Sequence, residues 1–138
     1  MRIFVSFAAF MAAMAVSSSV AVAENPKPDP DLFRVVQGTW GWKDSPASSC
    51  EQRPHVLTFA ENNTRMILKY PSTGAQYVYQ VLYAEKNKLT MLIEGEERRT
   101  DFGDRVIWVL VLNNPNSYQW RRTDWKPDLR TKEIVRCR

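Results

Sequence analysis

The sequence predicts an all-β protein, folded as an antiparallel eight-stranded up-and-down barrel. Short runs of alternating apolar side chains recur at close spacing, turn-forming residues separate these runs, and no helical pattern follows the amino-terminal segment. Eight strands can close into a barrel that is filled by its own side chains or holds one small ligand. The expected strands cover residues 36–43, 55–60, 65–70, 76–84, 88–94, 105–112, 117–123 and 131–137.

The first 23 residues have the pattern of a cleaved secretory signal peptide. A short basic start is followed by an uncharged apolar run, and Ala21-Val22-Ala23 is typical of a cleavage site. The apolar run is shorter than the ~20 residues of a spanning helix, so no membrane span is expected in the mature chain. We therefore expect a periplasmic or secreted protein with a proline-rich leader at residues 24–35 and one barrel domain at residues 36–138.

The elements of the first half are assigned from alternating side chains and from the turns between them. Residues 32–36 fit either one helical turn capped by Asp31 or the start of a strand. A polar loop follows the first strand, and an Asn-rich turn at residues 61–64 ends the second. The side chains expected to share a face, strand by strand, are Val36, Gly38, Trp40 and Trp42; His55, Leu57 and Phe59; Met66, Leu68 and Tyr70; and Tyr77, Tyr79, Val81 and Tyr83.

The second half continues the same pattern. A charged hairpin at residues 95–104 precedes the sixth strand, which is apolar throughout from Val106 and should be buried on both faces or covered on its outer face. Residues 113–116 are a strong turn signal before the seventh strand. The side chains expected to share a face are Leu89, Met91 and Ile93 in the fifth strand, and Tyr118 and Trp120 in the seventh.

The two cysteines, Cys50 and Cys137, are expected to form a disulfide, because an exported chain reaches an oxidising compartment. A reactive thiol is the alternative. The only histidine, His55, lies five residues from Cys50 in the sequence. The loop closed by this bond is long, so the entropic model gives an upper value of roughly 4 kcal/mol. In the predicted barrel the two cysteines start at opposite ends, so the loop at residues 43–54 must fold back along the wall, or the strand count is off by one.

Two short motifs resemble those of the lipocalins and the wider calycin group. Gly38-Thr39-Trp40 is similar to the Gly-x-Trp of the first strand, and Thr123-Asp124-Trp125 is similar to a Thr-Asp-Tyr-like turn near the carboxy terminus. The resemblance implies a small bacterial lipocalin-like barrel. In it, Trp40 closes the floor and packs against a basic side chain of the last strand, Arg136 or Lys132.

The chain departs from that pattern in three ways: it is shorter, it lacks the usual C-terminal helix, and one strand follows the second motif where two would be expected. The opening motif also resembles the avidin-like barrel, but no polar set in this chain matches a biotin site.

The resemblance and an aromatic content of 12% lead us to expect a non-catalytic barrel that binds or carries a small hydrophobic or amphipathic ligand. Trp40 and Trp108 are instead expected in the packed core, because aromatic rings supply large burial in a small barrel. The side chains expected to line the ligand cavity are Trp42, Tyr70, Tyr77, Tyr79, Tyr118 and Trp120.

Charged side chains crowd two places, a hairpin near residue 96 and the seventh strand. We expect them to be solvated and paired with each other, and the alternative is a rim that takes an anionic head group through arginine. These side chains are Glu94, Glu96, Glu97, Arg98, Arg99, Arg121 and Arg122.

Other classes of function find little support in the sequence. His55 is the single histidine, and a metal site needs several ligands, so neither a metal nor a cofactor is expected. The expected signal peptide holds one of the 19 basic residues, so the mature chain has 18 basic against 15 acidic residues, a net charge of +3. This mild excess does not call for nucleic acid. No catalytic motif is found, so the protein is not expected to be an enzyme.

A protein-interaction module of the cell envelope is the alternative function. Small exported barrels with one disulfide resemble bacterial lysozyme-type inhibitors, which plug a cleft with a loop. The loops at residues 45–53 and 96–104 are the candidates here, although the positive net charge disfavours a strongly basic lysozyme as the target.

Overall fold

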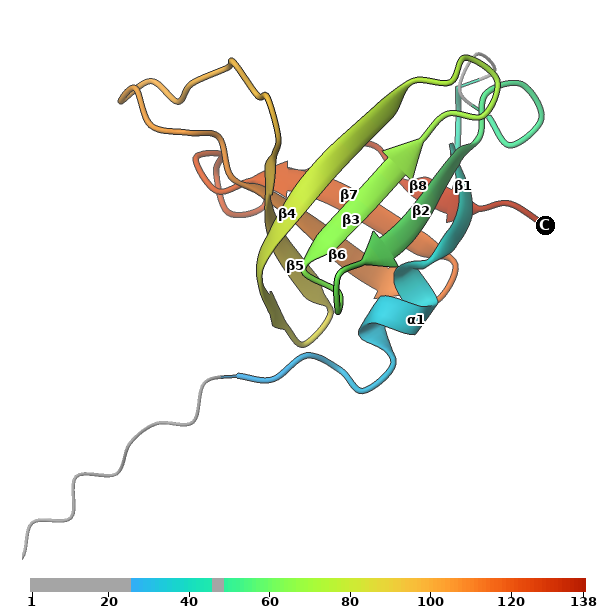
Figure 1. The fold of residues 1–138 in the computed structure, drawn as a ribbon, viewed down its shortest axis with the longest axis horizontal. Coiled ribbons are helices and arrows are strands. Elements are labelled where there is room, and N and C mark those ends of the chain that lie inside the picture. Colours follow the sequence, from blue (N-terminus) through green and yellow to red (C-terminus); the bar gives the residue numbers. More distant parts are fainter. Residues whose placement is uncertain (1–25, 46–48) are drawn as a thin grey trace, which may run out of the picture.

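The computed structural model describes residues 26–45 and 49–138, so the expected signal peptide lies outside the described residues. The described part folds into a closed antiparallel barrel in the order β1 to β8, with β8 pairing back onto β1 (Figure 1). The predicted eight-stranded up-and-down barrel is therefore confirmed. Its elements are α1 (Leu32–Val36), β1 (Gly38–Trp42), β2 (His55–Ala60), β3 (Arg65–Lys69), β4 (Gln76–Glu85), β5 (Lys88–Ile93), β6 (Trp108–Asn114), β7 (Ser117–Arg122) and β8 (Ile134–Arg136).

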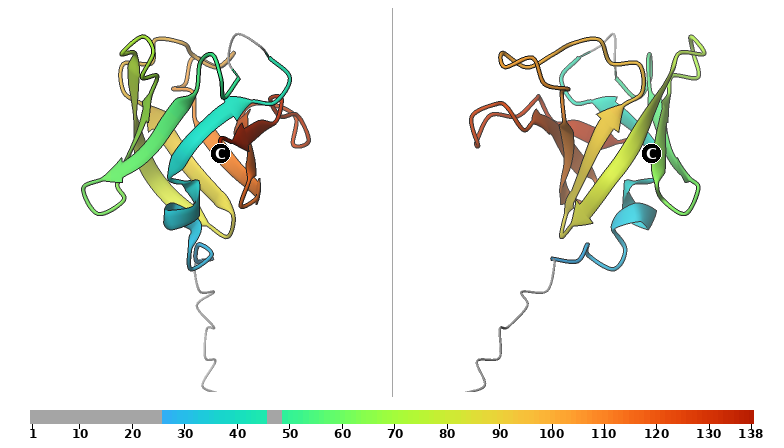
Figure 2. Two further views of the ribbon diagram at one scale, coloured as in Figure 1. Left: turned by 90° about the vertical axis from the view of Figure 1, so that its right-hand side faces the viewer. Right: turned by 60° about the vertical axis from the view of Figure 1, so that its left-hand side comes forward.

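The two ends of the barrel differ in how they are closed. Short turns between β2 and β3, β4 and β5, and β6 and β7 lie at the end covered by α1, and the longer loops lie at the other end (Figure 2). Residues Glu61, Asn62 and Asn63 in the first of these turns all have left-handed backbone, which asparagine tolerates well. We call the end at α1 the floor and the opposite end the mouth.

The floor half of the barrel is filled by its own side chains. Helix α1 contributes Leu32 and Val36, both buried, and the Trp40 indole donates a hydrogen bond of 3.0 Å to the Val36 carbonyl. The guanidinium of Arg136 lies above the same indole, with its central carbon 4.2 Å from the ring centroid. The fully buried side chains packed around them include Leu57, Met66, Leu89, Met91, Leu110, Tyr118 and Ile134.

The residues at 32–36 take the helical alternative, and β1 therefore begins at Gly38 rather than at Val36. Asp31 stands at the N-cap position, as expected, although its side chain makes no capping hydrogen bond. Its carboxylate instead accepts a hydrogen bond of 3.2 Å from Arg34, a charged donor one turn along the helix.

Both glycines of Gly38-Thr39-Trp40-Gly41-Trp42 are explained by close approaches. Gly38 has φ +136°, and a Cβ there would lie 2.5 Å from the Arg136 guanidinium. A Cβ at Gly41 would lie 2.6 Å from the backbone nitrogen of Cys50. The motif thus leaves room for the last strand at one position and for the β1–β2 loop at the other.

The expected disulfide between Cys50 and Cys137 is present, with the two Cα atoms 5.3 Å apart. The Cys137 amide donates a hydrogen bond of 2.8 Å to the Thr39 carbonyl, so the disulfide lies against β1. Because the backbone at Cys50 also lies against Gly41, the β1–β2 loop folds back along the barrel wall. The strand count therefore needs no revision.

Two further strands begin three residues later than predicted. β6 begins at Trp108 rather than at residue 105, because the chain before it still belongs to the long β5–β6 loop. β8 has three residues, and the Thr131 hydroxyl before it accepts a hydrogen bond of 2.9 Å from the Trp120 amide. The expected burial of the sixth strand on both faces is confirmed by three consecutive buried residues, Val109, Leu110 and Val111.

The expected face of strand four was wrong at Tyr83. A β-bulge between Val81 and Tyr83 shifts the register, so Tyr83 pairs with Thr90, whereas Val81 pairs with the core residue Met91. Residues directly opposite each other share a face. Tyr83 therefore lies on the outer wall, where it is 58% exposed.

Candidate ligand-binding site

The mouth half of the barrel holds a cavity of about 380 Å³ above the packed floor. Five of the six residues predicted to line a cavity are found around it. The lining residues are Trp42, Arg53, Leu68, Tyr70, Tyr77, Tyr79, Ile93, Arg98, Trp108, Trp120 and Thr131.

The wall of the cavity is a set of aromatic rings in contact. Tyr79 on β4 and Trp120 on β7 are stacked, with centroids 5.2 Å apart and planes 16° apart, and Trp108 meets the edge of Trp120 at 6.2 Å. Tyr70 and Tyr77 meet edge to face at 6.5 Å nearer the opening, where Tyr77 is half exposed. The wall therefore changes from buried rings at the base to exposed rings at the mouth.

Burial raises the pKa of Tyr79 well above the usual value for a phenol. Burial is also the main cause of the raised pKa of Tyr70. Both phenols therefore stay protonated across the physiological range, and each can donate a hydrogen bond to a ligand. The cavity combines an apolar body with polar tips, which suits an amphipathic ligand.

Two arginines face the cavity, and each lies over an aromatic ring. The central carbon of the Arg53 guanidinium is 4.9 Å from the Tyr70 centroid, and that of Arg98 is 5.3 Å from the Trp108 centroid. These distances are within the range of cation–π attraction.

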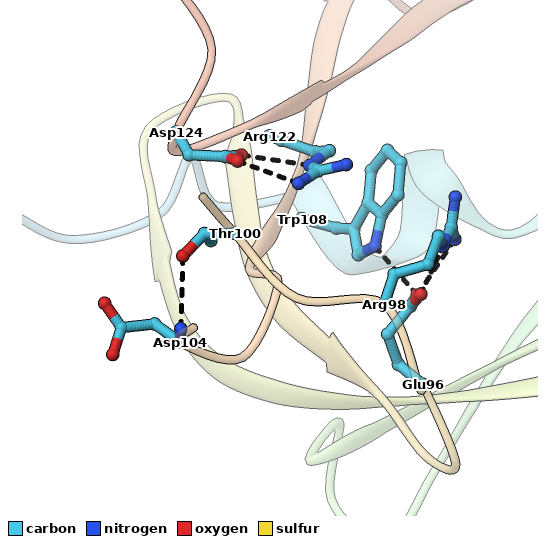
Figure 3. Close-up of polar contacts among 7 residues, drawn as sticks. All are labelled: Glu96, Arg98, Thr100, Asp104, Trp108, Arg122 and Asp124. Atoms are coloured by element: carbon cyan, nitrogen blue, oxygen red, sulfur yellow. Dashed lines mark hydrogen bonds and ion pairs between the residues drawn. The ribbon is translucent and has the colours of Figure 1, made fainter. Parts of the chain in front are cut away.

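A polar cluster on the β5–β6 loop holds the rim of the mouth (Figure 3). The Glu96 carboxylate accepts two hydrogen bonds from Arg98, one of them 2.9 Å, and a third of 3.3 Å from the Trp108 indole. The hydrogen bond from Arg98 is the main reason that the pKa of Glu96 is lowered. On the other side of Trp108, Arg122 forms a bidentate pair with Asp124 at 2.9 and 2.7 Å.

These contacts bear on two expectations. The charges do pair with each other at Arg98 and Arg122, and Glu94 pairs with Arg65 on the neighbouring β3. Trp108, expected in the packed core, instead lies partly exposed at the rim between two guanidinium groups, because β6 begins at this residue.

Tyr118 does not line the cavity. It is fully buried at the floor, 4.9 Å from Trp40 in an edge-to-face contact, and its hydroxyl lies 2.6 Å from His55 Nε2. Burial lowers the pKa of His55 to about 4, so the imidazole is neutral at pH 7. Alternation along β7 predicts that Tyr118 points inward, but it does not tell how far from the mouth the side chain ends.

Six lining residues were not assigned to the cavity from the sequence. Leu68 and Ile93 lie on the inward faces predicted for their strands, so alternation could have found them. Arg53 and Thr131 come from loops, where no periodicity exists. Arg53 is brought to the mouth by the loop that the disulfide holds. Arg98 and Trp108 complete the set.

Within residues 26–45 and 49–138, no group of three or more His, Cys, Asp or Glu residues could hold a metal ion. In the same part of the chain, no helix is both long enough and apolar enough to span a membrane.

The fold and this site define a closed eight-stranded barrel with a filled floor and an aromatic cavity at its mouth. No protein-family model matches the chain, and no curated protein matches it. Among solved structures, the chain is similar to the crystal structure of Treponema pallidum Tp0751 (pallilysin), with 13% sequence identity and a TM-score of 0.41 over 78% of this chain and 85% of that one. Because this superposition is loose, we draw no conclusion about activity or ligand from it.

Proposed function

We propose that this protein is an exported, non-catalytic barrel that binds a small hydrophobic or amphipathic ligand in its mouth cavity. The observation that carries the proposal is the position of the aromatic wall, which surrounds about 380 Å³ of space above a floor that is already filled. This volume falls within the range of small-molecule pockets, roughly 300–1,000 Å³. The stacked rings of Tyr79 and Trp120 both line this space and supply apolar contact area.

The proposed class is lipocalin-like. The contact between Trp40 and Arg136 at the floor, next to a short helix that precedes β1, supports it. The Trp125 ring of the second motif lies 5.9 Å from Trp108, so that turn packs against the rim of the mouth.

Export is supported by the disulfide, which is compatible with an oxidising compartment. Cell fractionation of a tagged chain tests this part of the proposal. A processed chain with oxidised cysteines in the periplasm or medium is expected, and an unprocessed, reduced chain in the cytoplasm would contradict export.

Ligand binding is tested with the neutral hydrophobic dye phenylnaphthylamine, whose fluorescence rises in apolar surroundings. The dye should bind saturably and quench tryptophan emission, because Trp108 and Trp120 line the cavity. Tyr77→Ser removes an exposed ring at the mouth and should weaken binding several-fold. Tyr83→Ser is the matched control, since Tyr83 lies on the same strand but on the outer wall. Absence of saturable binding would overturn the proposal.

A protein-binding role is the second candidate, and one observation favours it. Phe102 is 91% exposed at the tip of the β5–β6 loop, which is held as a hairpin by paired hydrogen bonds between Thr100 and Asp104. Such a side chain could enter a cleft of an envelope protein, for example a lysozyme. Part of the other candidate loop, residues 46–48, lies outside the described residues.

A peptidoglycan hydrolysis assay tests this second role. The wild-type protein should inhibit a lysozyme, and Phe102→Ser should relieve the inhibition while leaving dye binding unchanged. If the wild-type protein inhibits none of a panel of lysozymes, a lysozyme is excluded as the partner.

A further inference from the structure

We infer that the ligand of the mouth cavity is an anion with a planar apolar body, and that its negative group is bound by Arg53. The inference rests on the proposed function, because it specifies the chemistry of the ligand that the cavity takes.

The charge of the cavity lining is positive. Of the described residues that line it, the charged ones are Arg53 and Arg98, and none is acidic. Glu96, on the β5–β6 loop at the rim of the mouth, already accepts hydrogen bonds from Arg98 and Trp108, and its side chain is 7% exposed. Glu96 thus neutralises the charge of Arg98, whereas the charge of Arg53 is left unbalanced in the lining. A net positive lining favours binding of an anionic ligand.

Of the two arginines that line the cavity, Arg98 has an acidic partner and Arg53 has none among the described residues. Arg98 pairs with Glu96 and Arg122 pairs with Asp124. Among residues 26–45 and 49–138, no acidic side chain lies within ion-pairing distance of Arg53, whose guanidinium instead lies over the Tyr70 ring. Its N–H donors therefore remain available to the paired oxygens of a carboxylate, sulfonate or phosphate.

The disulfide gives this arginine a defined place. Arg53 is three residues from Cys50, which is bonded to Cys137 beside the last strand, and the Arg53 amide donates a hydrogen bond of 3.0 Å to the Ser49 carbonyl. The loop segment that carries Arg53 is therefore anchored to the wall, and less side-chain and loop ordering has to accompany ligand binding.

The apolar part of the ligand is inferred from the shape of the wall. Six of the lining residues are aromatic, and two of them, Tyr79 and Trp120, present parallel rings. Rings prefer to stack on or meet the edges of other rings, so a planar body makes more contact here than a flexible chain of equal volume.

Two dyes with the same aromatic skeleton test the inference. Anilinonaphthalene sulfonate carries a sulfonate, and phenylnaphthylamine does not. Titration of the oxidised mature protein should show that the anionic dye binds about tenfold more tightly, and that added salt reduces this advantage by screening. Arg53→Gln should weaken binding of the anionic dye about three- to tenfold more than it weakens binding of the neutral dye.

Arg34→Gln is the matched control, because it removes the same charge from α1 at the floor end of the barrel. Binding of the neutral dye alone would overturn the inference and leave the proposed function standing. Binding of the anionic dye that Arg53→Gln does not weaken would do the same. Equal losses in the two arginine variants would also overturn it, since net charge would then explain the preference. Failure of both dyes to bind would remove the proposed function itself.

Discussion

The central carbon of the Arg136 guanidinium lies 4.2 Å from the centroid of the Trp40 ring, and the two residues are direct partners in the pairing of β1 with β8. The same guanidinium donates hydrogen bonds to the carbonyls of Val35, Gln37 and Pro115, those to Gln37 and Pro115 both at 3.0 Å. One side chain thus joins the helix end, the first strand, the last strand and the turn between β6 and β7, at the point where the barrel closes.

Removal of this side chain should destabilise the barrel. Arg136→Ala loses a cation–π contact and three charge-assisted hydrogen bonds, so we expect a loss of about 2–4 kcal/mol in the free energy of unfolding. Arg136→Lys should recover part of it, because lysine keeps the charge but not the planar fork. Urea denaturation measures both.

Lys132→Ala is the control for this series. Lys132 is the other basic residue considered as a partner of Trp40, but it is exposed. Its removal should change the free energy of unfolding by less than about 0.5 kcal/mol. A larger loss for Lys132→Ala than for Arg136→Ala would contradict the assignment of the floor contact.

Stability should also depend on pH through the buried imidazole of His55. Its pKa is about 4 in the folded protein and about 6.5 in an unfolded chain, because burial disfavours the charged form. Above pH 6.5 the group is neutral in both states. As the pH falls from 6.5 to 4, the unfolded chain binds the proton first, so about 3 kcal/mol of stability is lost in that window.

Urea denaturation at several pH values, compared with His55→Gln, isolates this contribution. The glutamine amide can still hydrogen bond to the Tyr118 hydroxyl but does not titrate. The stability difference between the two proteins should narrow as the pH falls towards 4. A difference that does not change with pH would show that His55 titrates normally.

The disulfide should stabilise the fold and keep the mouth in shape. The bond joins residues 87 positions apart, and the entropic model gives up to roughly 4 kcal/mol for its removal. The double variant Cys50→Ser, Cys137→Ser should therefore unfold at lower urea. It should also bind the anionic dye more weakly even where it is fully folded, because Arg53 is no longer anchored. Dye binding equal to that of the wild type would mean that the loop holds its place without the bond.

Gly41→Ala should disturb the same loop by direct contact. The new Cβ would lie 2.6 Å from the Cys50 nitrogen and 2.9 Å from the Ser49 carbonyl carbon, so the backbone must move. We expect a loss of about 1–3 kcal/mol and a disulfide that glutathione reduces more readily.

Gly74→Ala separates this effect from the general cost of losing a glycine. It meets no atom within 4 Å, and its φ of +72° alone should cost about 1–2 kcal/mol. Its disulfide should be reduced as in the wild type. Equal reduction of the disulfide in the two variants would contradict the close approach at Gly41.

Much of the barrel could be predicted because alternation is a local property of the chain. Side chains of a half-buried strand must alternate, so Met66, Leu68, Leu89 and Met91 indicate their inward faces without knowledge of their neighbours. The turn at residues 61–64 was equally readable, since left-handed backbone suits asparagine. The prediction was wrong at Tyr83, because a β-bulge adds one residue to the strand and so reverses the alternation after Val81.

The site was harder to predict because it depends on depth and on loops. Tyr118 and Trp120 alternate in the same way, yet one is packed at the floor and the other lines the cavity. Their difference comes from where each residue sits along the tilted strand, which the pairing of β6, β7 and β8 decides.

The sequence by itself determined the class of fold, the pairing of its two cysteines and most of the inward aromatic residues, because each follows from local periodicity or from residue type. Only the tertiary structure decided that the floor is filled while the mouth is hollow, since this depends on whether side chains from eight strands meet at the same height. It also decided that Arg53 faces the cavity with no acidic partner among the described residues, because the disulfide from Cys50 to the distant Cys137 and the course of a loop place it there.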